Sequence, residues 1–154
     1  MCGQVEVPMS EFKPRRCREC GEGMIVPVAK PGRRMPFRNM AALAVPSTLE
    51  IPTCNHCGNE WIDPKTAQAI DEALQGAYAN ELHKRLVAAI DAIMMATDIP
   101  QRRLEQLLGL SVGYISRLRS GRGDASAQVV SALALLARDP QRRVKELDQL
   151  WASE

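Results

Sequence analysis

The chain has 154 residues, 45% of them hydrophobic, and a formal net charge of +2, so it is long enough for one domain or two small ones and too apolar for a disordered protein. It has neither an apolar run of about 18 residues nor an N-terminal signal-peptide pattern, which argues against membrane insertion and secretion and predicts a cytoplasmic protein. Charge is unevenly distributed, since residues 13–40 hold eight basic and two acidic side chains whereas residues 60–98 hold three and seven.

Five cysteines in a cytoplasmic chain indicate metal ligands or bystanders rather than disulfides. Residues 1–13 show no strong pattern and are expected to form a flexible tail in which Cys2 is a free thiol. The other four cysteines form two C-x-x-C-G pairs separated by 33 residues: Cys17, Cys20, Cys54 and Cys57. Two thiolates in one tight turn can bind a common ion, and two such turns complete a tetrahedral shell of four sulfurs. We expect one structural zinc ion per chain, with iron as the alternative, and His56 as a bystander.

Short strands are predicted over residues 24–28 and 48–51, on either side of a basic segment at 30–38 that proline and glycine interrupt. Together with the cysteine pairs they predict a zinc ribbon over residues 14–63. A core of about 45 residues is too small to be stable on burial alone, so loss of the metal should unfold it. A closed shell of four sulfurs leaves no position to activate water, and no nucleophile–base pattern or phosphate loop is visible, so we do not expect an enzyme.

A helical pattern begins at Asp63 and Pro64, which suit the N-cap and the first turn of a helix. Apolar residues then recur at steps of three and four as far as Met94, with Gly76 as the one interruption. Residues 64–98 are therefore predicted to form either one long connecting helix or two helices hinged near Gly76.

Residues 99–123 predict two short amphipathic helices joined by a tight turn. The first begins at Pro100, places the leucines of residues 104–108 on one buried stripe, and ends at Gly109, where a positive φ is favoured. Residues 99–124 hold five arginines and two acids, a local excess of the kind that phosphate binding uses. This is a helix-turn-helix signature, although two helices and a glycine turn also occur in structural α-hairpins.

The second of these helices would carry the base-reading residues, since in helix-turn-helix proteins it enters the major groove while the first helix crosses the DNA backbone. We expect Ser111 to cap it and Ile115 and Leu118 to face inward. Arg117 would read a guanine base, and Arg102, Arg119 and Arg122 would contact phosphates of the DNA backbone. The expected DNA-binding residues are Gln101, Arg102, Ser111, Val112, Gly113, Tyr114, Arg117, Arg119 and Arg122.

Two further helices are predicted at the C-terminal end, one over residues 126–138 and one from Gln141 onward, separated by Asp139 and Pro140. Their apolar content exceeds what one helix face of a small monomer needs. They are therefore the candidate dimer surface, with ordinary core packing as the alternative.

The two helices of residues 99–123 resemble the Xre, or lambda-repressor-like, helix-turn-helix family. The residues that carry this resemblance are Gln101, Gly109, Ile115, Ser116, Leu118 and Gly121. Glu105 departs from the pattern, because that family usually has a small alanine there, packed between the helices.

The order of a zinc knuckle pair and an Xre-type domain is similar to the MqsA, or YgiT-type zinc finger, antitoxin family. The matching residues, between about 17 and 136, are Cys17, Cys20, Gly23, Met24, Cys54, Cys57, Val112, Ser116, Arg117 and Gly121. The resemblance implies a structural zinc site, a dimer formed through the C-terminal half, repression of the protein's own operon, and a toxin bound by the zinc domain. Arg117 stands at the position of a base-reading arginine of that family, and Gly113 replaces a base-reading asparagine.

We therefore predict an α+β protein in which a small N-terminal zinc ribbon is joined by residues 64–98 to an all-α, lambda-repressor-like domain at 99–154, whose first helix begins near residue 81. The predicted function is that of a zinc-stabilised, sequence-specific transcriptional regulator, the antitoxin and autorepressor of a type II toxin–antitoxin system. The expected partners are double-stranded DNA with a palindromic operator, a second copy of the chain and a toxin protein, with no membrane partner. The alternatives are a stand-alone repressor whose ribbon binds DNA, RNA or protein through residues 30–38, and a rubredoxin-like electron-transfer protein.

Overall fold

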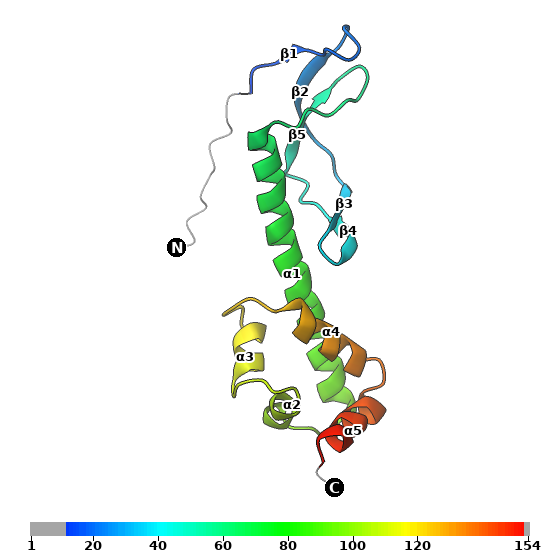
Figure 1. Cartoon of the computed structure of the whole chain (residues 1–154), viewed down its shortest axis with the longest axis vertical. Coiled ribbons are helices and arrows are strands. Elements are labelled where there is room, and N and C mark those ends of the chain that lie inside the picture. Colours follow the sequence, from blue (N-terminus) through cyan, green and yellow to red (C-terminus); the bar gives the residue numbers. More distant parts are fainter. Residues whose placement is uncertain (1–11, 153–154) are drawn as a thin grey trace. The chain divides into compact units, whose positions relative to one another are not determined.

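The structure is a computed structural model that describes residues 12–152, so Cys2 and nearly all of the expected tail lie outside the described residues. The chain divides into two compact units, with the boundary between Ala77 and Tyr78. The N-terminal region contains small antiparallel sheets and the C-terminal region is helical, which confirms the α+β class (Figure 1). Within the described part of the chain, no helix is long and apolar enough to cross a membrane.

Two small antiparallel sheets form the β-structure of the first unit (Figure 1). The three-stranded sheet has the strand order β1-β2-β5 and consists of β1 (Arg15–Arg16), β2 (Met24–Ala29) and β5 (Glu50–Cys54). Its register places Ile25 opposite Cys54. Because Cys54 begins the second C-x-x-C-G pair and Ile25 closely follows the first, this register brings the two pairs to the same end of the sheet.

The second sheet is a hairpin of β3 (Arg34–Phe37) and β4 (Met40–Ala44), which the sequence pattern does not predict. Proline and alanine disfavour strands, so the segment, with its arginines, has the sequence pattern of a basic loop. Proline is tolerated because the strand register shifts between Met35 and Phe37, and a proline at such an irregularity removes no regular hydrogen bond. Arg38 forms the turn with a φ of 50° and donates from Nη2 to Oε1 of Gln75 at 3.1 Å.

Helix α1 (Pro64–Ala96) is one continuous helix, and it contains the boundary between the two units. Oδ1 of Asp63 accepts a hydrogen bond from the Thr66 N–H at 2.7 Å, which confirms the predicted N-cap and lowers the pKa of Asp63. Gly76 lies within the helix without breaking it, because the cost of about 1 kcal/mol for an interior glycine is small beside the packing of a long helix. Of the two possibilities for this segment, the single helix is observed.

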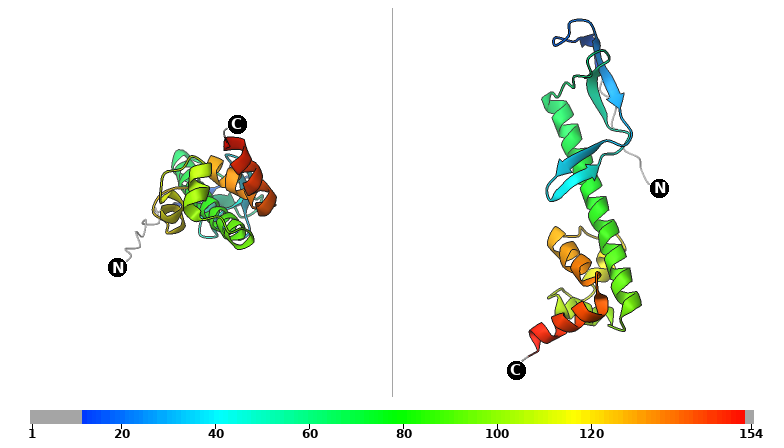
Figure 2. Two further views of the ribbon diagram at one scale, coloured as in Figure 1. Left: turned by 90° about the horizontal axis from the view of Figure 1, so that it is seen from below. Right: turned by 90° about the vertical axis from the view of Figure 1, so that its right-hand side faces the viewer.

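The second unit packs four short helices with the C-terminal part of α1. They are α2 (Gln101–Leu107), α3 (Tyr114–Arg119), α4 (Ala127–Leu136) and α5 (Pro140–Trp151). Helix α4 lies beside the C-terminal part of α1 in the views of Figures 1 and 2. The most deeply buried side chains come from α1, α2, α3 and α4: Leu86, Ile90, Ile93, Leu104, Ile115 and Leu133.

The start of α3 differs from the prediction that Ser111 caps it. Helix α3 begins at Tyr114, and its N-cap is Gly113, whose φ of 81° is left-handed and favours glycine. The hydroxyl of Ser111 instead accepts a hydrogen bond from Nη2 of Arg117 at 3.1 Å. The predicted cap was wrong because the chain makes two further turn residues before the helix begins.

Replacing Ile93 by alanine should lower the free energy of unfolding of the second unit by about 2–5 kcal/mol, because Ile93 is fully buried and its removal leaves a cavity. Met95, two residues further along α1, is 89% exposed, so Met95→Ala is a matched control with an expected change within about 0.5 kcal/mol. Urea unfolding followed by far-ultraviolet circular dichroism measures both. Equal effects of the two substitutions would contradict this placement of the core.

Candidate metal centre and nucleic-acid interface

The two C-x-x-C-G pairs form matching closed turns. The Gly21 N–H donates to the carbonyl oxygen of Cys17 at 3.1 Å, and the Gly58 N–H donates to that of Cys54 at 3.1 Å. Both glycines have a positive φ, 69° and 74°, which residues with a side chain rarely adopt. The fifth residue of each motif is therefore required to be glycine by the backbone of the turn.

The four predicted cysteines converge on one point. The sulfur atoms of Cys17 and Cys57 are 3.8 Å apart, those of Cys20 and Cys54 are 3.7 Å apart, and all four lie within 4.8 Å of one another. In a tetrahedral site with metal–sulfur bonds of about 2.3 Å, the sulfurs are separated by about 3.8 Å. The cluster therefore fits one four-coordinate metal ion, and an ion held by all four sulfurs has no open position for a substrate.

Backbone N–H groups stabilise negative charge on two of the sulfurs. Gly23 donates to Sγ of Cys20 and His56 donates to Sγ of Cys54, each at 3.4 Å. The hydrogen bond from Gly23 is the main cause of a lowered pKa at Cys20. At Cys54, hydrogen bonds led by that from the Cys57 N–H lower the pKa to about 6. These two positions favour the thiolate form that binds metal.

The pKa of Cys57 shifts in the opposite direction, because negative charge is unfavourable where four sulfurs lie close together. The Asn59 N–H lowers the pKa of Cys57, but desolvation and the three neighbouring thiols outweigh it and raise the pKa to about 12. Like charges this close cannot all ionise without a compensating charge. A metal cation among the sulfurs supplies that charge, so the donor set fits a cation on electrostatic as well as geometric grounds.

Two residues other than the cysteines and the closing glycines also shape the cluster, Gly23 and Asn55, and the sequence pattern predicts a structural role for neither. A Cβ added to Gly23 would lie 2.4 Å from Sγ of Cys54 and 2.6 Å from Cβ of His56, so no side chain fits there. Asn55 joins the second knuckle to β2, since its Oδ1 accepts from the Met24 N–H at 2.9 Å and its own N–H donates to the Met24 carbonyl at 3.0 Å. Of these two roles, only that of Gly23 could have been suspected from the sequence, because a glycine stands two residues after the first C-x-x-C-G motif.

The four-cysteine cluster is surrounded by a small apolar core and a few charged side chains. Cys17, Ile25 and Cys54 form its buried core, against which the partly buried Phe12, Cys20 and Trp61 pack. The guanidinium of Arg15 lies 4.1 Å from the centre of the Trp61 ring. The imidazole of His56 lies outside the group of sulfurs, with Nε2 3.1 Å from Oε2 of Glu22.

The basic segment at 30–38 is partly neutralised within its own unit. Lys30 and Arg33 both face Oε1 of Glu60, at 3.7 and 2.8 Å. Arg34 donates from Nη1 to the carbonyl oxygen of Ala42 at 3.1 Å. Less free positive charge is therefore available on this segment than its sequence suggests.

Several of the residues predicted to bind DNA meet at the turn before α3. Arg117 donates from Nη2 to Oγ of Ser111 at 3.1 Å and from Nη1 to the carbonyl oxygen of Val112 at 3.4 Å. Val112 is 67% exposed, and Tyr114 is half-buried at the first position of α3. A Cβ on Gly113 would make only an ordinary contact with Nη1 of Arg117, at 3.6 Å, so glycine is favoured there by its positive φ of 81° rather than by lack of space.

The remaining predicted residues lie on both sides of this group. Gln101 donates from Nε2 to Oγ of Ser116 at 2.6 Å, which links α2 to α3. Arg102 is exposed on α2, and the exposed Arg122 donates from Nε to Oγ of Ser120 at 3.0 Å. Arg119 instead faces α1, where its Nη2 lies 2.6 Å from Oδ1 of Asp91.

Gly23→Ala should reduce the metal content of the purified protein to well below one ion per chain, because the added methyl would collide with the sulfur of Cys54. Gly76→Ala is the matched control, since a Cβ there meets no atom within 4 Å and the variant should keep its metal. Elemental analysis of both proteins measures this. A Gly23→Ala protein with full metal content would mean that the cluster does not have the described geometry.

No known family model matches the sequence, and no curated protein matches it. The described residues offer two chemical features. One is a cluster of four cysteines whose sulfurs fit one metal ion, and the other is an exposed turn between two short helices to which Arg117 of α3 donates hydrogen bonds.

Proposed function

We propose that this chain is a zinc-stabilised, dimeric regulator of transcription that binds a specific DNA sequence through α2 and α3. The observation that carries the proposal is the exposed, hydrogen-bonded group of Ser111, Val112 and Arg117 around the start of α3, on a pair of short helices whose Leu104 and Ile115 are fully buried. This is the arrangement expected of a helix-turn-helix pair, in which residues at the start of the second helix meet base edges.

The side chains around the start of α3 match the chemistry of the major groove. Arg117 could exchange its two hydrogen bonds within the turn for the O6 and N7 acceptors of a guanine, which match its fork. Val112 offers an exposed apolar contact for a thymine methyl group. Arg102 and Arg122 are exposed on either side and suit phosphates. Gly113 would act through its backbone, because it permits the turn and leaves the groove side open.

Zinc is the proposed occupant of the four-cysteine cluster. Zinc takes four sulfurs in a tetrahedral site, has no redox chemistry, and contributes folding energy to small domains. The small core around Cys17, Ile25 and Cys54 fits a unit that needs such a contribution. Iron in the purified protein, with visible thiolate absorption, would instead favour the electron-transfer alternative.

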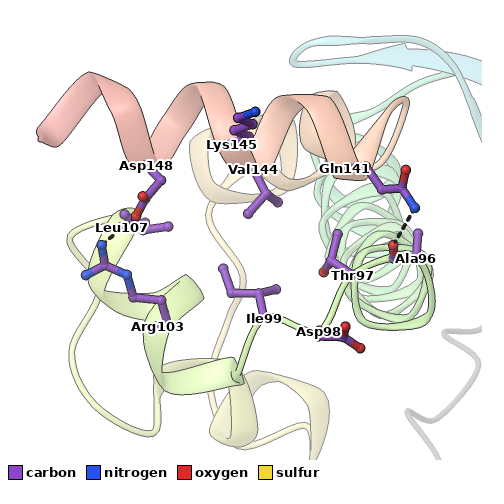
Figure 3. Close-up of a pocket in the computed structure, with 10 residues that line it drawn as sticks. All are labelled: Ala96, Thr97, Asp98, Ile99, Arg103, Leu107, Gln141, Val144, Lys145 and Asp148. Carbon is purple, nitrogen blue, oxygen red and sulfur yellow. Dashed lines mark hydrogen bonds and ion pairs between the residues drawn. The ribbon is translucent and has the colours of Figure 1, made fainter.

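Dimerisation is proposed to use α5, an amphipathic helix with no buried residue among its twelve. Leu150 and Trp151 are 69% and 66% exposed. A first groove, of about 500 Å³, lies between the middle of α5 and residues 96–107, and a second, of about 590 Å³, lies between Leu147 and Trp151 of α5 and residues 103–109. Figure 3 shows Val144 and Ile99 directed into the first groove from opposite sides. An apolar face of this kind suits a second copy of the chain, whose two-fold symmetry would match a palindromic operator.

The proposed antitoxin role rests on the resemblance to the MqsA, or YgiT-type, family and assigns a toxin partner to the first unit. The pairing of Lys30 and Arg33 with Glu60 favours a protein over a nucleic acid as the partner of the 30–38 segment. A gene for a small toxic protein beside the gene for this chain would support the antitoxin role. A solitary gene would favour the stand-alone repressor, which shares the same DNA-binding surface.

Arg117→Ala should weaken binding to a duplex from the promoter of the protein's own gene by about 1–3 kcal/mol, because the bidentate contact to guanine is lost. Arg85→Ala removes the same charge from α1, where Arg85 pairs with Glu81 at 2.8 Å, and should leave binding unchanged. Titrations of both variants at one salt concentration, against the promoter duplex and a scrambled duplex, measure the difference. If Arg117→Ala bound both duplexes like the unmodified protein, the base-reading assignment would be wrong.

Trp151→Ser should weaken self-association by more than about tenfold, because a large exposed aromatic side chain at an interface is a common hot spot. Met95→Ser is the control, since Met95 is also exposed but lies on α1 rather than α5. Sedimentation equilibrium at micromolar concentration measures both. An unmodified protein that stays monomeric, or a Trp151→Ser protein that dimerises as before, would contradict the α5 interface.

A further inference from the structure

Glu105 is a buried acidic residue that the proposed DNA surface does not include. It lies on α2 and is 3% exposed, between the buried Leu104 and Leu107. A carboxyl group is costly to bury unless it is hydrogen-bonded. Its Oε2 accepts a hydrogen bond from the backbone N–H of Ile115, at 3.4 Å. The burial of the Glu105 side chain is thus accompanied by a hydrogen bond to the backbone of α3.

The hydrogen bond from Ile115 to Glu105 gives α3 a side-chain acceptor at its N-terminus, which its own N-cap residue does not provide. The first N–H groups of a helix have no partner within the helix, and a side chain at the N-cap usually accepts one of them. The N-cap of α3 is Gly113, which has no side chain. The Tyr114 N–H donates to the Ser111 carbonyl at 3.1 Å, and the next N–H, that of Ile115, donates to Glu105. Helix α3 therefore takes its side-chain cap from α2.

A second polar link joins the same two helices. Gln101 precedes Glu105 by four residues, so both side chains lie on one face of α2. Gln101 donates to the hydroxyl of Ser116 at 2.6 Å, while Glu105 accepts from Ile115. Apolar contacts are non-directional, whereas hydrogen bonds set a direction and a distance. The two links therefore restrict how α3 can rotate or slide on α2.

We propose that Glu105 is a positioning residue for DNA recognition, which caps α3 from α2 and so holds Arg117 and Val112 at a fixed angle without contacting DNA itself. Base-reading side chains must be held within about 0.5 Å of their productive geometry, and supporting hydrogen bonds provide that precision. This inference rests on the proposed DNA-binding function. It assigns a role to the residue that replaces the small alanine usual in Xre-type sequences.

The test uses Glu105→Ala and Glu105→Gln in the full-length, metal-loaded protein. Alanine removes the acceptor and leaves the Ile115 N–H unpaired, so the ratio of affinities for the promoter duplex and a scrambled duplex should fall by about tenfold or more. Glutamine keeps a carbonyl oxygen that can accept the bond, so it should restore most of that ratio. Leu133→Ala, in the core at α4, is the control for a general loss of stability and should leave the ratio unchanged.

A second readout does not depend on DNA. The readout is the hydrogen-exchange rate of the Ile115 amide, measured by nuclear magnetic resonance and compared in each variant with the rate expected from global unfolding of that variant. On this measure, exchange should become faster in Glu105→Ala and stay slow in Glu105→Gln and Leu133→Ala. If Glu105→Ala kept both the affinity ratio and the protected amide, or lost the ratio no more than Leu133→Ala, the positioning role would be refuted. If the unmodified protein showed no preference for the promoter duplex while the amide behaved as expected, the DNA-binding function would fail and the cap would stand.

Discussion

The first unit depends on the convergence of four sulfur atoms within 4.8 Å of one another. Each closest sulfur pair joins the two knuckles, so an ion bound there cross-links residues that are 34 and 40 positions apart in the sequence. The apolar core beside it is small. Desolvation and the three neighbouring thiols raise the pKa of Cys57, and a cation among the sulfurs would offset both effects. The sheet, the closed glycine turns and an ion at the four sulfurs would therefore support one another, whereas the second unit has a buried core of leucine and isoleucine.

Features determined by local sequence were predictable. The C-x-x-C-G spacing predicts a four-sulfur cluster because each turn is set by five consecutive residues, and the four cysteines do converge. Asp63 and Pro64 predict the start of α1 through a cap that needs only the next turn of chain. The burial of Leu104, Ile115 and Leu118 follows from helical periodicity. The α+β class follows from the same local patterns.

Features that depend on contacts between distant residues were not predictable. One local feature was also missed, since the β3–β4 hairpin contains Pro36 at an irregularity of its register, and Phe37 is the only residue of its two strands whose type favours strands. Ser111 has the right chemistry for a cap, but the helix begins later, at Tyr114, and takes its side-chain hydrogen bond from Glu105 on another helix. The need for glycine at position 23 arises from a sulfur atom 31 residues away, so only the folded chain reveals it.

Selection of bound sequences from a pool of random DNA duplexes by the full-length, zinc-loaded protein tests most directly whether the chain is a sequence-specific DNA-binding dimer. A two-fold symmetric dimer that places α3 in successive major grooves should enrich a palindrome whose half-sites are centred about 34 Å apart, one turn of DNA. Each half-site should contain an invariant guanine that Arg117 can read. A pool that remains random after repeated rounds, at a salt concentration low enough for phosphate binding, would contradict sequence-specific recognition by α2 and α3.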